Sequence, residues 1–158
     1  MKSFAFNTFL SIALMSGFLF SSEKAFAHCE IPCGIYEDSV RIAIIKEHIT
    51  TIEKSMNKIK EESASDSPNW NQLVRWVNNK EEHAKKIQDI VSQYFLHQRI
   101  KLTDAEDKKA YAKYQKHLGL LHQMLVYSMK AKQTTDQAFT DKLRKAVAAF
   151  EDSYFHKH

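Results

Sequence analysis

The stretch Asp38–Glu62, DSVRIAIIKEHITTIEKSMNKIKEE, decides the fold class. Apolar residues recur along it in alternating steps of three and four: Ile42, Ile45, Ile49, Ile52, Met56 and Ile59. This spacing predicts a long α-helix with one apolar stripe, because residues three and four apart share a helix face. Such a stripe must be buried against other elements, so further helices with an apolar stripe are expected along the chain.

Three further helices are predicted. Ser67 is suited to be an N-cap with Pro68 at the first helical position, and this second helix should end near 97–101. Thr103–Glu106 has the form of a capping box that opens a third helix, and Thr134–Gln137 precedes a fourth. The expected apolar stripes are Leu73, Val77, Ala84, Ile87, Val91 and Tyr94; then Tyr111, Tyr114, Leu118, Leu121 and Leu125; then Phe139, Leu143, Val147, Phe150 and Tyr154.

Composition supports an all-α protein of one domain. The chain has 158 residues but only three Gly and two Pro, so few chain reversals are available for a many-stranded β fold. Short connections force neighbouring helices to run antiparallel, which predicts an up-down-up-down four-helix bundle over residues 38–158. The net charge is +4, and no basic block contains interleaved aromatic residues, so we expect no nucleic-acid partner.

Residues 1–27 have the features of a cleaved secretory signal peptide. Lys2 is followed by a twelve-residue apolar run from Phe9 to Phe20, too short for an ordinary membrane span, and Ala25-Phe26-Ala27 is an A-x-A cleavage signal. Cleavage would leave a mature chain, 28–158, that begins with His28 and has no stable membrane anchor. We therefore expect export to the periplasm or secretion; the alternative is an uncleaved N-terminal anchor.

The segment 28–36, HCEIPCGIY, carries both cysteines of the chain and offers several metal donors. The α-amine of His28, the amide nitrogen of Cys29 and the thiolates of Cys29 and Cys33 can form a planar set of two nitrogens and two sulfurs. The His28 imidazole can approach along the axis. This planar set suits Ni(II) or Cu(II), whereas zinc prefers a tetrahedron. The alternative is a Cys29–Cys33 disulfide that closes the loop.

This segment closely resembles the N-terminal hook of nickel superoxide dismutases, H-C-x-x-P-C-G-x-Y. The resemblance implies a four-helix bundle that assembles as a hexamer and converts superoxide to O2 and H2O2 by Ni(II)/Ni(III) cycling. It implies that His28, Cys29 and Cys33 are the nickel ligands and that Tyr36 borders the metal. Ser92-Gln93-Tyr94-Phe95 is similar to a Ser-Asp-Tyr-Phe stretch of the family, which makes Tyr94 the second tyrosine; from spacing alone, Tyr94 can equally be a core residue.

The sequence departs from the family pattern around the axial histidine. Many members have Glu after an Arg-Ile pair in the first helix, whereas Ala43 stands there in this chain. Arg75, Asn79 and Glu47 are our candidates for the group that orients His28. The histidines of the later helices, His83, His97, His117 and His122, lack the i, i+4 spacing of a helical metal pair, so we expect surface or interface roles.

Two rival functions remain open from the sequence. One is a nickel- or copper-binding module without catalytic turnover, which would use the same N-terminal donors. The other is a helical interaction protein whose N-terminal loop is closed by the Cys29–Cys33 disulfide.

Overall fold

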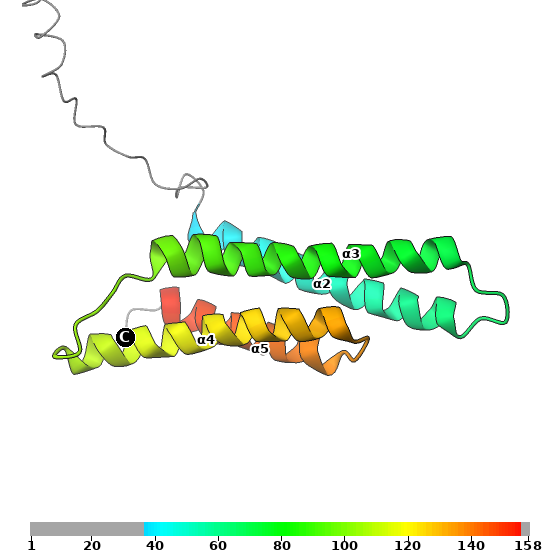
Figure 1. Ribbon diagram of the computed structural model, residues 1–158. Helices are drawn as coiled ribbons and strands as arrows, with labels where there is room; N and C mark the ends of the chain where they lie inside the picture. Colours follow the sequence, from blue (N-terminus) through cyan, green and yellow to red (C-terminus); the bar gives the residue numbers. More distant parts are fainter. Residues whose placement is uncertain (1–36, 156–158) are drawn as a thin grey trace, which may run out of the picture.

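The computed structural model describes residues 37–155, and all regular structure in this range is helical (Figure 1). Helix α2 spans Asp38–Ser63, α3 spans Trp70–Asp89 and continues as the π-helix η1 over Ile90–Arg99, α4 spans Lys108–Gln133 and α5 spans Ala138–Phe155. The prediction of an all-α protein is confirmed. The predicted signal peptide and the metal-binding hook, 1–36, lie outside the described residues.

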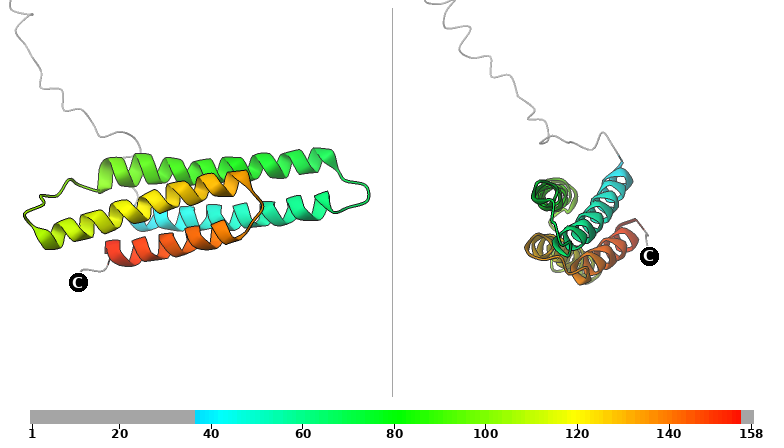
Figure 2. Two further views of the ribbon diagram at one scale, coloured as in Figure 1. Left: turned by 60° about the horizontal axis from the view of Figure 1, so that its bottom comes forward. Right: turned by 90° about the vertical axis from the view of Figure 1, so that its right-hand side faces the viewer.

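Consecutive helices run in opposite directions and lie side by side (Figures 1 and 2). Helix α2 packs against α3, α3 against α4 and α4 against α5, and α5 returns to contact α2. This order agrees with the bundle expected from the short connections. The start of α2, the end of η1 and the end of α5 therefore meet at one end of the molecule. Within 37–155, no helix is long and apolar enough to cross a membrane.

The apolar stripe of α2 forms the centre of the core. All six residues predicted for it are buried, and five of them have no exposed surface. Leu143, Val147 and Phe150 of α5 are fully buried as well. On α3 and η1, burial is concentrated toward the C-terminal half, at Ala84, Ile87, Val91, Tyr94 and Phe95.

The buried face of α4 differs from the prediction. The buried residues are His117, Leu121, Met124, Ser128 and Ala131, and only Leu121 belongs to the predicted stripe. The Ser128 hydroxyl satisfies itself by donating to the carbonyl of Met124 at 2.7 Å, so it tolerates burial. The large apolar residues of α4 lie mostly on the neighbouring face, so their spacing predicted the wrong buried side of this helix.

Two predicted helix starts are wrong by a few residues. Helix α3 is capped by Asn69, whose Oδ1 accepts from the backbone N–H of Gln72 at 3.2 Å, and not by Ser67. Helix α4 is capped by Asp107 and not by Thr103. In both cases an Asn or Asp immediately before the helix supplies the cap, and residues of both types are among the strongest N-caps.

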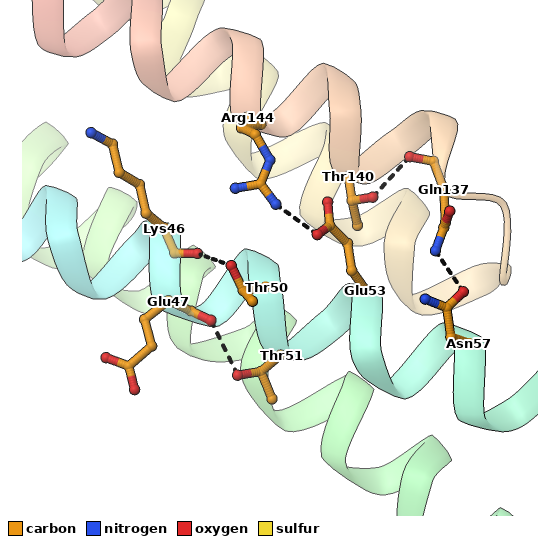
Figure 3. Close-up of polar contacts among 9 residues, drawn as sticks. All are labelled: Lys46, Glu47, Thr50, Thr51, Glu53, Asn57, Gln137, Thr140 and Arg144. Atoms are coloured by element: carbon orange, nitrogen blue, oxygen red, sulfur yellow. Dashed lines mark hydrogen bonds and ion pairs between the residues drawn. The ribbon is translucent and has the colours of Figure 1, made fainter.

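Polar contacts fix α5 against the outer side of α2 (Figure 3). The Arg144 guanidinium lies 2.6 Å from the Glu53 carboxylate, and the Gln137 amide donates to Asn57 at 2.7 Å. These contacts join residues 91 and 80 positions apart in the sequence. They set the register of the last helix on the first.

Candidate functional site at the end of the bundle

The π-helix η1 brings the side chains of Tyr94 and Arg99 into contact. Hydrogen bonds in a π-helix run between residues five apart, as in the 2.9 Å bond from the N–H of Ile100 to the carbonyl of Phe95. Tyr94 and Arg99 are also five apart, and Nη2 of Arg99 donates to the phenol oxygen of Tyr94 at 3.0 Å. An α-helix would turn these two residues to different sides. Short π-helical stretches occur frequently at functional sites.

Asp38, in the first turn of α2, joins this pair to α5. Its carboxylate accepts from the phenol of Tyr94 at 2.5 Å and from the phenol of Tyr154 at 2.7 Å, and Nε of Arg99 lies 3.0 Å away. Tyr94 is 1% exposed. We call Asp38, Tyr94, Arg99 and Tyr154 the tyrosine cluster. It connects three elements within two residues of Tyr36, the last residue of the predicted hook.

The cluster has a defined charge state. Burial raises the pKa of the Asp38 carboxyl, but the hydrogen bonds from Tyr94 and Tyr154 and the charge of Arg99 outweigh it, so the pKa lies below its ordinary value. Burial and the hydrogen bond to Asp38 raise the pKa of Tyr94, and the same two causes raise that of Tyr154. At neutral pH the carboxylate is charged and both phenols keep their protons.

Two guanidinium groups lie near the ring of Tyr94. The guanidinium of Arg41 lies 5.1 Å from the centre of its ring, and that of Arg99 lies 4.8 Å away. Such positions over an aromatic face are favourable cation–π contacts. Arg99 and Tyr154 also line a cavity of about 340 Å³, together with Lys101 and Lys113. The end of the bundle is therefore suited to attract a small anion.

The predicted site residues divide into two groups. His28, Cys29, Cys33 and Tyr36 lie outside the described residues, so their placement stays a prediction. Tyr94 lies in the tyrosine cluster, next to the point where the chain enters α2. Residues 37–155 contain no group of three or more His, Cys, Asp or Glu that could hold a metal ion. The amine, amide and thiolate donors of 28–33 fit nickel chemically, since this strongly donating set favours a planar ion.

The three candidates for orienting His28 lie away from the tyrosine cluster. Asn79 donates to the Ser55 hydroxyl at 2.9 Å, and Arg75 is exposed one turn earlier on α3. At 1.5 Å per residue, these positions are about 22 and 28 Å along the helix from Tyr94. Glu47 is exposed on α2, and Figure 3 shows its carboxylate directed away from α5.

The sequence analysis missed Asp38, Arg99 and Tyr154 as partners of Tyr94. One signal was present, an acidic residue in the first helical turn directly after the hook, where it also complements the helix dipole. The expectation of a surface or interface role for His117 is wrong within the described chain. His117 is 7% exposed and its Nε2 lies 3.1 Å from the Ser153 hydroxyl.

An all-α chain whose cysteine- and histidine-bearing N-terminal segment joins the bundle beside a buried, charge-stabilised tyrosine has the features of a redox metalloenzyme. The family model of the nickel-containing superoxide dismutases matches residues 23–158. The chain belongs to this family, which makes it an oxidoreductase with nickel as cofactor and superoxide as substrate. The predictions of family, enzyme class and cofactor are confirmed. No curated protein and no solved structure matched the chain.

Proposed function

We propose that the mature chain, cut after Ala27, disproportionates superoxide to O2 and H2O2. Nickel would be held by the amine and imidazole of His28, the amide nitrogen and thiolate of Cys29 and the thiolate of Cys33. When bound to these donors, nickel supplies a one-electron Ni(II)/Ni(III) couple. The anionic sulfurs and amide stabilise the higher oxidation state, which supports this assignment.

The position of Tyr94 is the observation that carries the proposal. Tyr36 precedes Asp38 by two residues, a span of at most about 7 Å. Asp38 in turn binds the Tyr94 phenol at 2.5 Å. Tyr94 is therefore bound to a carboxylate two positions after Tyr36 in the sequence, at the end of the bundle where α2 begins.

The side chains of the cluster have distinct roles in this proposal. Asp38 and Arg99 hold the Tyr94 phenol in one orientation, and its proton points at Asp38. In this proposal Tyr36 and Tyr94 bound the pocket for superoxide, and Tyr94 acts there as a fixed group and not as an acid, because its pKa is raised by burial and by Asp38. The charge of Arg99 is paired with Asp38, and Lys101 and Lys113, which line the cavity beside it, supply the local positive charge that attracts superoxide. The two protons that peroxide requires would come from solvent.

We further propose that signal peptidase cleavage between Ala27 and His28 both exports the protein and creates the amine ligand. The mature protein would be periplasmic or secreted and would assemble as a homohexamer. In an oxidising compartment the two thiols can pair, so nickel must bind before disulfide formation. Terminal sequencing of the exported protein should begin at His28, and sedimentation should give six chains per particle.

The decisive experiment extends the mature chain by one Ala before His28. This moves the α-amine away from the Cys29 amide and opens the chelate ring, so nickel-reconstituted protein should lose superoxide dismutase activity. The control carries the same Ala after His158. Full activity in the N-terminal extension would reject the amine-ligand assignment.

The same preparation separates the rival functions. A chain that binds nickel but shows no rate above free nickel would be a non-catalytic nickel- or copper-binding module. A native mature chain with a Cys29–Cys33 bond and no nickel, seen by mass spectrometry, would support a disulfide-stapled interaction protein.

A further inference from the structure

Two histidines on different helices face each other along the side of the bundle. His48 of α2 and His83 of α3 place their Nδ1 atoms 3.0 Å apart. The ring centroids are 4.8 Å apart and the rings are nearly perpendicular, at 81°. Both side chains are half-buried, and 35 positions separate them in the sequence. Neither histidine belongs to the tyrosine cluster or to the segment 28–36.

One hydrogen atom links the two nitrogens, and a metal ion can take its place between them. One ring must carry hydrogen on Nδ1 and the other must accept it, since two bare nitrogens repel. For metal–nitrogen bonds of about 2.05 Å, nitrogens 3.0 Å apart subtend an angle of about 94° at the ion. This value is near the right angle between neighbouring ligands of tetragonal ions such as Cu(II) and Ni(II), and below the tetrahedral angle that zinc prefers.

Charged groups of both signs surround the two histidines. Glu47 on α2 and Glu82 on α3 directly precede the two histidines in the sequence. The charge of each carboxylate acts to raise the pKa of His48 and of His83. Lys86 is the opposing charge and lies 2.7 Å from Glu82, so these two charges offset each other and Glu47 is the acidic group that would favour a cation. Burial is the largest cause that lowers the pKa of His48 and of His83, so both imidazoles are neutral at pH 7 and able to bind metal.

We propose that His48 and His83 form a second metal site, which takes a divalent ion of the Cu(II) or Ni(II) type and bridges α2 to α3. Two imidazole nitrogens hold the ion. Since the described residues bring no third His, Cys, Asp or Glu into a ligating group, water fills the remaining positions. The site is independent of the N-terminal donors, so it does not rest on the proposed catalytic function.

The test uses full-length mature protein whose hook is already loaded with nickel. Calorimetric titration with Ni(II) alone should show that each chain binds a second equivalent of nickel. The double variant His48→Gln, His83→Gln should lose this equivalent and keep the first. The matched control is His122→Gln, an exposed helical histidine on α4, which should keep both. Replacing Cys29 and Cys33 by Ser should remove the first equivalent only.

Two results would overturn the site: no second equivalent in the unaltered protein, or a second equivalent that survives in the double variant. If the double variant misfolds, long-range 1H–15N spectra of the unaltered protein decide the matter, with Ni(II) added as a paramagnetic probe that shifts the resonances of the nitrogens that bind it. The ring-nitrogen resonances of His48 and His83 should shift together while those of His122 stay in place. Failure of the His48 and His83 signals to move would refute the proposal.

Discussion

Replacing Asp38 by Asn removes the one negative charge to which two phenols and a guanidinium are bound. Hydrogen bonds to a charged group contribute about 1.5–3 kcal/mol each and neutral ones about 0.5–1.5 kcal/mol, so two weakened bonds cost about 2 kcal/mol. The Arg99 pair adds less, because these side chains are 24% and 28% exposed and solvent screens them. We expect Asp38→Asn to be destabilised by about 2–3 kcal/mol, or roughly 10 °C in Tm for a chain of this size.

Guanidinium unfolding monitored by circular dichroism, repeated across pH, measures this effect. The pKa of Asp38 is depressed in the folded protein, so its contribution is complete above the unfolded-state pKa of about 4. The contribution is lost as pH falls through the still lower folded pKa. The difference between the variant and the unaltered protein should therefore be largest at neutral pH and shrink below about pH 4.

The matched control is Asp66→Asn, an exposed carboxylate in the connection between α2 and α3. It should change stability by less than about 0.5 kcal/mol. If Asp38→Asn is no more destabilising than this control, or if its effect is unchanged at pH 3, the charge-based account of the cluster is wrong.

Three further substitutions test buried contacts of the bundle. Lys80→Met should cost about 2 kcal/mol in guanidinium unfolding, because the buried Nζ donates to the carbonyls of Ala131 and Lys132 in the last turn of α4. The control is Lys85→Met on the exposed face of α3, and equal costs for the two variants would show that these hydrogen bonds do not stabilise the protein. Burial lowers the pKa of His117, so below about pH 6.5 the unfolded chain binds a proton that the folded protein does not, and stability falls by up to about 1.4 kcal/mol per pH unit. His117→Gln should remove this contribution and make stability depend less steeply on pH in that range. An unchanged slope of stability against pH would contradict the prediction. Phe150→Ala, which empties a fully buried position, should cost about 3–5 kcal/mol by the same assay, and a cost below 1 kcal/mol would contradict the core assignment.

The fold was predictable where large apolar residues repeat without interruption. The apolar stripe of α2 repeats without a gap, so the helix, its bounds and its buried side follow from spacing, and only Ser55 is added to the buried residues by the structure. The face of α4 was not predictable in this way, because Ser128 and His117 are buried there. Burial of polar residues depends on partners supplied by the folded structure, such as Ser153 for His117.

The candidate site was predictable only where its residues are contiguous in sequence. The hook segment is a motif of nine residues, and Tyr94 was found through a local resemblance. Asp38, Arg99 and Tyr154 became its partners through helix pairing and through the π-helical turn that brings residue 99 above residue 94. An α-helical register, the natural assumption for a long periodic segment, separates those two side chains. The His48–His83 contact has the same origin, since only the antiparallel register of α2 and α3 reveals it.

The tyrosine cluster also predicts that the bundle constrains the proposed metal centre, whose donors precede the first helix in the sequence. Asp38 is held by η1 and α5 at once, so the start of α2 is fixed by two elements far away in the sequence. Fixing this point limits the positions available to Tyr36 and to the donors that precede it. Loss of Asp38 should therefore reduce turnover even though no nickel ligand is changed. Asp38→Asn protein that retains one hook-bound nickel but loses activity would separate this positioning role from metal binding, whereas undiminished turnover would show that the hook is ordered by other contacts.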